Sequence, residues 1–203
     1  MTTHEPRGTL AIREGFTLLL DEHQLDRLQC LTVIQGLLRV AASNGAEEAL
    51  EAQPVTLGFL QSGDHLPLDL LRNKRLHLKA LTPCWLEEGC PTIPAAGASS
   101  LHDWTLELLL IRNLSDAEGR ITALLQLLVQ RLGRRGGAWY ELPLHFTHAD
   151  LAQLCGHNRV TVTRQLSRWR DRGLIEQNSG PQRCLRLAPE LVEDAAQLAP
   201  RPH

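Results

Sequence analysis

Four side chains near residue 160 are of the types that proteins use to read DNA. Arg159 and Arg164 each carry a guanidinium group, and such a fork can bind O6 and N7 of one guanine together. Since they are five residues apart, they stand about 140° apart around a helix, so one can face the base edges while the other reaches in from the flank. The hydroxyls of Thr161 and Thr163 suit phosphate oxygens. This group predicts binding to double-stranded DNA.

The residues around this group predict a helix-turn-helix, whose second helix enters the major groove. Thr147 can cap the first helix, small Ala152 suits a close helix crossing, and Gly156 allows a left-handed turn. The buried side is expected to consist of Leu151, Leu154, Val162 and Leu166. The alternative is a plain amphipathic hairpin with a solvated basic face. Residues 147–186 hold seven Arg and three acids in a chain of net charge −2, and this local excess favours DNA.

Segments before and after the helix pair complete a winged-helix domain. Ser115 and Glu118 form a capping-box pattern, which predicts a helix that stops at Gly133 or at Gly136-Gly137. A two-stranded ribbon behind a recognition helix is typical of a wing. The expected segments are an extended piece at 139–144, wing strands at 174–176 and 184–187 joined by a turn at 178–181, and a closing helix over 189–198. Arg183, just after the wing's turn, is expected to contact the DNA backbone.

The first half of the chain predicts a different kind of domain. Residues 8–90 contain short apolar or alternating runs separated by turns, and no helix-length periodicity competes with them. The expected strands are 10–12, 16–20, 30–35, 37–41, 55–60 and 76–81. Short strands at such intervals predict a small β-sandwich or barrel, so the whole chain is expected to be α+β.

A connector and a helix join the two halves. The connector at 89–99 is rich in Pro, Gly and Ala, and the helix is expected to begin at 99–100. An apolar seam along this helix comprises Leu101, Trp104, Leu108 and Ile111. Because these residues recur every three or four positions, we interpret them as a dimer interface with a second copy of the chain. Core packing within one chain is the alternative.

The order of these parts resembles the Crp/Fnr superfamily of bacterial transcription regulators over nearly the whole chain. In the first half the resemblance rests on Ile12-Arg-Glu-Gly15, Leu31-Thr-Val-Ile-Gln-Gly36-Leu-Leu-Arg39-Val and Leu60-Gln-Ser-Gly63-Asp64. In the second half it rests on 147–175, including Gly173-Leu174-Ile175. It implies a β-roll like a cyclic-nucleotide-binding jelly roll over 1–90, a linker and short dimerisation helix over 91–113, and a winged-helix DNA-binding domain over 114–203.

The resemblance also implies a function and partners. The protein would be a transcription regulator rather than an enzyme, would bind a palindromic DNA site as a homodimer, and would contact RNA polymerase if it is an activator. The base readers would be Arg159 and Arg164, and the phosphate contacts would be Thr147, Asn158 and Thr161.

The recognition helix, Arg159-Val160-Thr161-Val162-Thr163-Arg164, resembles that of the cyanobacterial global nitrogen regulator. Cyclic-AMP receptor proteins carry Glu after the first Arg, where it accepts from a cytosine amino group. Val160 cannot accept a hydrogen bond, but its methyl groups can pack on a thymine methyl. We therefore expect GTA and TAC half-sites one helical turn apart rather than the TGTGA type.

The chain departs from the family's cyclic-nucleotide pocket. The family motif, a Gly-Glu pair followed shortly by Arg-Ser or Arg-Thr, is absent, and Gly63-Asp64 stands in its place. Asp64 and Asp69 would repel a phosphate. Neither Arg72 nor Arg75 has an obvious pocket, so cyclic AMP is not expected and no cofactor is predicted. An unidentified small-molecule effector and an effector-independent architectural dimer are both left open.

Metal or thiol sensing is a further alternative. The candidates for a metal or haem site are His65, His77, Cys84 and Cys90, but Cys84-x5-Cys90 is not the tight spacing of a structural zinc knuckle. Cys155 lies in the turn before the recognition helix, where oxidation would disturb helix docking. The five scattered cysteines, with no signal peptide or membrane span, indicate reduced thiols in a cytoplasmic protein. Catalysis by the β-roll is a separate alternative, and it would require His and acidic residues to converge inside the roll.

Overall fold

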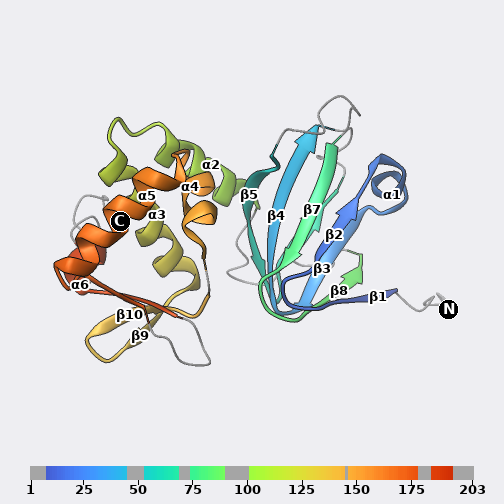
Figure 1. Ribbon diagram of the computed structural model, residues 1–203. Helices are drawn as coiled ribbons and strands as arrows, with labels where there is room; N and C mark the ends of the chain where they lie inside the picture. The colour runs from blue at the N-terminus through green and yellow to red at the C-terminus, as the bar shows by residue number, and fades with distance from the viewer. Residues whose placement is uncertain are drawn as a thin grey trace, which may run out of the picture. The chain divides into compact units, whose positions relative to one another are not determined.

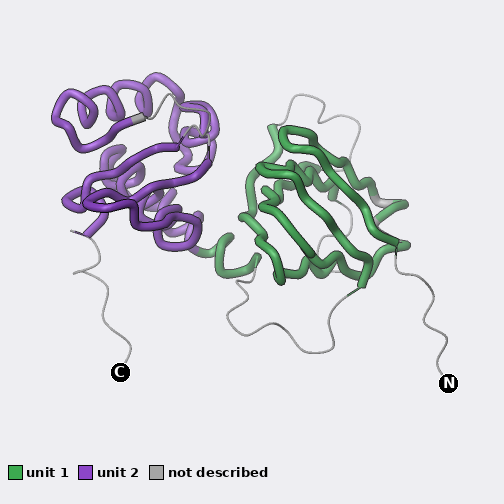
Figure 2. The backbone as a smooth tube through the Cα atoms, turned by 90° about the horizontal axis from the view of Figure 1, so that it is seen from below, with its two compact units in different colours: residues 1–106 green, residues 107–203 purple. Residues whose placement is uncertain are grey.

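The computed structural model describes residues 8–44, 53–68, 74–89, 101–144, 146–177 and 184–193. They divide into two compact units, residues 1–106 and residues 107–203 (Figure 2). Strands dominate unit 1 and helices dominate unit 2 (Figure 1). Among the described residues, no helix is long and apolar enough to cross a membrane.

Unit 1 is built from antiparallel strands in two layers. They are β1 (Thr9–Ile12), β2 (Thr17–Leu20), β3 (Cys30–Gln35), β4 (Leu37–Asn44), β5 (Val55–Gln61), β6 (His65–Pro67), β7 (Lys74–Ala80) and β8 (Cys84–Glu88). The two sheets have the orders β1-β8-β3-β6 and β2-β7-β4-β5. Each of these strands contributes to one hydrophobic cluster, which includes Leu38, Leu60, Leu78 and Leu86. Alternate residues of a strand face the same side, which explains why alternating runs of sequence predict strands here.

Three elements of unit 1 fall outside the predicted strands: β6, β8 and a helix, α1 (Glu22–Arg27). Helix α1 is too short to show helical periodicity and begins with a capping box. The Asp21 side chain accepts from the Gln24 N–H at 3.0 Å, and the Asp21 N–H donates to Gln24 Oε1 at 3.0 Å. The sequence analysis did not predict this helix, because it found no helix-length periodicity over residues 8–90.

The first turns of α2 (Leu101–Arg112) pack on unit 1, and the compact unit ends inside this helix. Gly58 of β5 has no side chain at the place where Trp104 lies against the strand. Trp104 is fully buried and meets Phe59 edge to face, with 5.0 Å between the ring centroids. The division at 106 and 107 thus differs from the domain bounds at 90 and 113 predicted above, because the tryptophan joins the start of α2 to the sheet.

The predicted dimer seam is buried within its own chain. Trp104, Leu108 and Ile111 are only 0%, 2% and 6% exposed, and Leu101 packs against the core of unit 1. Their assignment to a dimer interface is corrected to core packing, the alternative stated above. The large exposed apolar side chains of α2 are instead Leu106, Leu109 and Leu110.

Unit 2 combines helices with a small sheet. It contains α3 (Ala117–Leu132), β9 (Arg134–Gly136), β10 (Trp139–Leu142), α4 (His148–Cys155), α5 (Arg159–Asp171), β11 (Ile175–Gln177), β12 (Leu185–Leu187) and α6 (Pro189–Glu193). The sheet is antiparallel in the order β11-β12-β10-β9. Both wing strands are confirmed, whereas the predicted turn and Arg183 lie outside the described residues. Asp116, not Ser115, caps α3, and it accepts from the Gly119 N–H at 2.6 Å.

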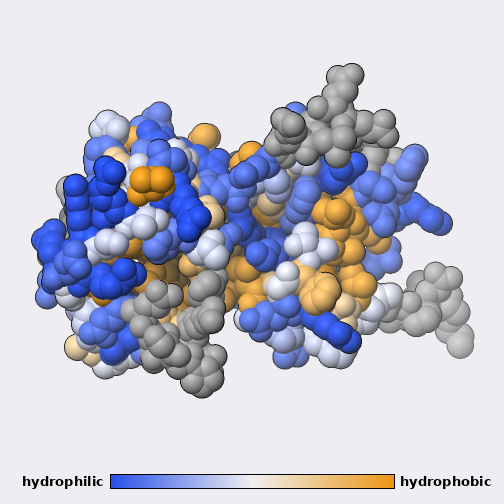
Figure 3. Space-filling view, in the orientation of Figure 1, coloured by the Kyte–Doolittle hydropathy of each residue, from blue (hydrophilic) through white to orange (hydrophobic). Residues whose placement is uncertain are grey.

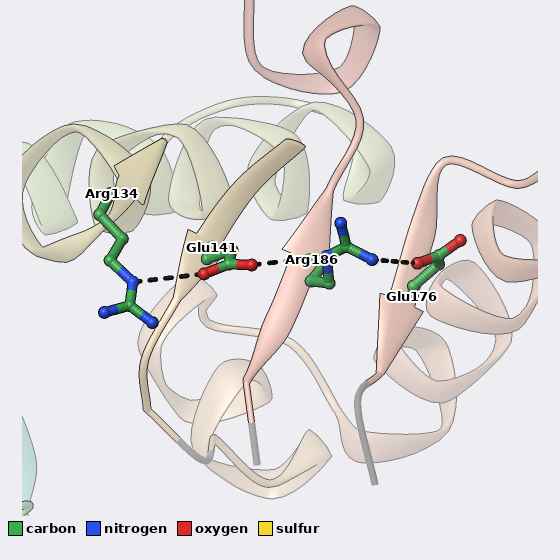
Figure 4. A network of polar contacts seen from close by, with 4 residues as sticks. All are labelled: Arg134, Glu141, Glu176 and Arg186. Atoms are coloured by element: carbon green, nitrogen blue, oxygen red, sulfur yellow. Dashed lines mark hydrogen bonds and ion pairs between the residues drawn. The ribbon is translucent and has the colours of Figure 1, made fainter. Parts of the chain in front are cut away.

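A row of alternating charges crosses the sheet of unit 2 (Figure 4). Glu141 of β10 lies between two arginines, 3.2 Å from Arg134 Nε and 3.6 Å from Arg186 Nε. Arg186 of β12 also contacts Glu176 of β11 at 2.8 Å. Because these side chains are partly solvated, each pair contributes at most about 1 kcal/mol. Opposite charges across neighbouring strands nevertheless favour this register over a slipped one.

Replacing Gly58 with Ala is expected to destabilise unit 1 by about 1–3 kcal/mol, since a well-packed site must absorb an extra methyl group. The new Cβ would lie 2.4 Å from Trp104 Cβ. The measurement is the midpoint of urea unfolding followed by circular dichroism. Gly8→Ala is the control, because a Cβ there meets nothing within 4 Å. An unchanged midpoint for Gly58→Ala would contradict the packing of Trp104 on β5.

Candidate nucleic-acid interface

Two capped helices and a glycine turn position the candidate interface. Thr147 begins α4 with a capping box, in which its hydroxyl accepts from the Asp150 N–H at 3.1 Å and its own N–H donates to Asp150 Oδ2 at 3.0 Å. Gly156, with φ 69° and ψ 36°, ends α4 in the left-handed conformation. Asn158 caps α5 by accepting from the Thr161 N–H at 2.8 Å. The predicted helix-turn-helix is confirmed.

Helix α5 has a buried side and an exposed side. Its buried residues are Val162, Gln165, Leu166 and Trp169, and those of α4 are Leu151, Ala152, Leu154 and Cys155. The buried side predicted from the sequence is therefore confirmed. On the exposed side, one shallow hollow is lined by Arg159, Val160, Thr163 and Arg164.

The exposed side of α5 combines cations with one apolar side chain. Side chains over α5 are mostly hydrophilic (Figure 3), yet Val160 is 66% exposed. A valine between two arginines suits a groove floor that offers both acceptor atoms and thymine methyl groups. The arrangement therefore offers the kinds of group that read base edges, which a purely basic surface lacks.

Thr163 is tied to α4 by a residue that the sequence analysis missed. Its Oγ1 lies 2.8 Å from His148 Nδ1. Burial, and then the charges of Arg170 and Arg159, lower the pKa of His148, so its imidazole is neutral at pH 7. When the proton is on Nδ1, His148 donates to Thr163 and leaves the hydroxyl proton for a phosphate. In the other tautomer Thr163 donates to His148 and has no proton to offer.

The other predicted phosphate contacts differ in what their side chains already bind. Thr147 donates its hydroxyl proton to Asp150 Oδ2 at 2.6 Å, so a phosphate contact would have to break this bond. Asn158 uses its side-chain oxygen in the cap, is exposed, and has amide protons to donate. Thr161 is partly exposed in the first turn of α5. The residue types can be read from the sequence, but the hydrogen bonds that these side chains already make cannot.

The metal and thiol alternatives find little support in the geometry. The described residues contain no group of three or more His, Cys, Asp or Glu that could hold a metal, and Cys90 lies outside them. Cys84 is buried and donates to the Leu37 carbonyl at 3.2 Å. Cys155 is fully buried, and burial raises the pKa of its thiol, which disfavours the reactive thiolate. Cys30 is disulfide-bonded, which differs from the expectation of reduced thiols throughout.

The segment that replaces the cyclic-nucleotide motif holds a buried acid. Asp64 is 4% exposed, and its Oδ2 accepts from the Gln61 N–H at 2.7 Å. A carboxylate buried at this place would oppose a phosphate group. Asp69 and Arg72 lie outside the described residues, and Arg75 is exposed.

Comparison with known proteins gives a consistent result for both units. Residues 10–99 match the N-terminal domain of the cyanobacterial CRP family, and residues 119–190 match the Crp-like helix-turn-helix domain. The regulatory protein CysR of Synechococcus elongatus is 37% identical over 75 residues, which are 36% of this chain and 36% of CysR. The matched part thus spans about a third of that relative. The finer likeness to the nitrogen regulator stays a prediction.

Solved structures share the fold at low identity. A CRP/FNR-family regulator from Thermus thermophilus has a TM-score of 0.64 and 22% identity, covering 92% of this chain and 98% of that one. A mutant of CooA from Carboxydothermus hydrogenoformans has a TM-score of 0.67 and 18% identity, covering 95% of this chain and 87% of that one. Each unit thus matches one domain of Crp-type proteins: unit 1 matches the N-terminal domain of the cyanobacterial CRP family, and unit 2 matches the Crp-like helix-turn-helix domain.

Proposed function

We propose that this protein binds a specific palindromic DNA site as a homodimer and regulates transcription there. The observation that carries the proposal is the exposed side of α5, where Arg159, Val160 and Arg164 line one hollow. The opposite side of α5 is held by buried apolar contacts, so the base-reading side chains start from a fixed backbone. Pre-organised contacts of this kind favour one sequence over others, whereas flexible cations bind any duplex.

Each residue of the interface has a proposed role. Arg159 and Arg164 read bases, and Val160 packs on a thymine methyl. The likeness of this helix to that of the cyanobacterial nitrogen regulator favours GTA and TAC half-sites one helical turn apart. The phosphate contacts proposed are Asn158, Thr161, Arg183 of the wing and, in the tautomer described above, Thr163.

The homodimer is proposed to form through the exposed apolar stripe of α2. Leu106, Leu109 and Leu110 are 48%, 61% and 54% exposed, and they lie on the side of the helix opposite Trp104 and Leu108. A second copy of α2 would remove this apolar surface from water. A two-fold axis between the copies would match the symmetry of a palindrome. Contact with RNA polymerase would follow if the protein is an activator.

Arg159→Ala and Arg164→Ala are each expected to weaken binding to a GTA/TAC palindrome by about 1–3 kcal/mol and to relax the base preference, because each removes a guanidinium fork from a base edge. Fluorescence anisotropy with the palindrome, a TGTGA palindrome and a scrambled duplex measures both effects. Several salt concentrations separate base reading from backbone attraction.

The matched control is Arg168→Ala, an exposed arginine of the same helix outside the hollow. It should change the affinity for all three duplexes alike. Small and equal losses on every duplex for the Arg159 and Arg164 variants would refute their role in base reading.

Leu110→Arg is expected to convert the dimer into a monomer at micromolar concentration, since an unpaired guanidinium would be buried between the two helices. Sedimentation velocity gives the mass directly. Glu107→Gln, an exposed change on the flank of the same helix, should leave the dimer intact. If Leu110→Arg remained dimeric, the interface would have to lie elsewhere.

A further inference from the structure

The carbonyl groups at the end of α4 are bound by a residue from another helix. The last four carbonyls of an α-helix have no partner within the helix. The carbonyl of Ala152 accepts from the N–H groups of Gly156 and His157. The next two carbonyls, of Gln153 and Leu154, accept from Arg112. Helix α4 has no basic residue in its own last turn, so Arg112 supplies the cation that this negative end of a helix dipole favours.

The contact of Arg112 with this helix end is two-pronged and close. Its Nη2 donates to the Gln153 carbonyl at 3.1 Å and its Nε donates to the Leu154 carbonyl at 3.1 Å. A planar guanidinium that binds two groups at once fixes an orientation as well as a distance. The Arg112 side chain also lies against the turn, since a Cβ on Gly156 would be 3.2 Å from Arg112 Cγ. Arg120 of α3 reaches the Gly156 carbonyl at 3.5 Å.

Arg112 stands at a special place in α2. It is the last residue of the helix, and Leu109 and Leu110 of the proposed dimer stripe precede it by one turn or less. The carbonyls that it holds belong to the end of α4, directly before the turn that leads into α5. One side chain therefore joins the end of the proposed dimer helix to the helix pair that presents Arg159 and Arg164.

We infer that Arg112 is a positioning residue that sets the direction of α5 relative to the dimer helix, and hence the spacing and angle at which a dimer presents its two recognition helices. The inference rests on the proposed homodimer and palindrome. Because Arg112 is not proposed to contact DNA, the effect of replacing it should depend on the presence of two half-sites in one duplex. Affinity for a single half-site should be nearly independent of Arg112.

The test compares the full chain with its Arg112→Ala, Arg112→Gln and Arg112→Lys variants on three kinds of duplex. These are the GTA/TAC palindrome, the same palindrome with one or two base pairs inserted between the half-sites, and a single half-site. Arg112→Ala is expected to lose about tenfold in affinity for the correctly spaced palindrome and less than about threefold for the single half-site. Its preference for the correct spacing over the inserted duplexes should also diminish.

The other variants keep the test decisive if Arg112→Ala folds poorly. Arg112→Gln should show the same selective loss, because its side chain is shorter and lacks the charge and the planar fork of the guanidinium. Arg112→Lys should recover part of the palindrome affinity, because it restores the charge at the end of α4. Arg27→Ala, an exposed arginine of unit 1, is the control and should match the unmodified protein on every duplex.

Three results would overturn the inference. Equal losses on the palindrome and the single half-site would mean that Arg112 only supports the fold of the helix pair. Unchanged affinity and spacing preference in the Arg112→Ala and Arg112→Gln variants would mean that it positions nothing. If the unmodified protein showed no preference for the palindrome over a single half-site, the proposed function would fail, and the role of Arg112 would fail with it.

Discussion

The proposed reading of DNA bases depends on opposite requirements for the two sides of α5. One side of this helix must be buried deeply enough to hold the backbone still, and the other must leave its cations to solvent. Leu166 and Trp169 are 2% and 1% exposed, and burial of each such side chain is worth about 1.5–3 kcal/mol. That is more than a surface ion pair would supply. Arg159 and Arg164 can therefore remain exposed without loss of the helix that carries them.

Helix α2 also has two distinct sides, and both of them carry apolar side chains. Trp104, Leu108 and Ile111 face the interior of the chain, whereas Leu106, Leu109 and Leu110 face water. Both sets recur at helical spacing, so periodicity alone predicts an apolar stripe twice over. A residue far away in the sequence distinguishes the buried stripe from the exposed one. Gly58 opens a place for an indole ring that no other residue type would leave.

The recognition helix and its turn could be predicted because their signals are local. Thr147 and Gly156 each mark the start or end of a helix within four residues, and the structure uses both; Asn158, predicted only as a phosphate contact, also caps α5. The hydrogen bonds of the site could not be predicted in this way. A threonine at a helix start suits a phosphate by its type, but Thr147 already gives its proton to Asp150, and Thr163 is bonded to His148 fifteen residues earlier. Residue type says what a side chain can bind, while tertiary packing decides what it does bind.

Helix α2 is also the continuous element through which a change in unit 1 would reach the helix-turn-helix. Trp104 anchors its start beside Gly58 and Phe59, and Arg112 anchors its end to the carbonyls of α4. Within unit 1, leucines from both sheets fill the core, and buried Asp64 is bonded to the main chain of its own turn. An anionic effector at that turn would have to displace a carboxylate of its own charge. Trp104 and Arg112 thus stand near opposite ends of one helix, so a ligand that changed the packing of Trp104 on β5 would act on the same helix that binds the end of α4.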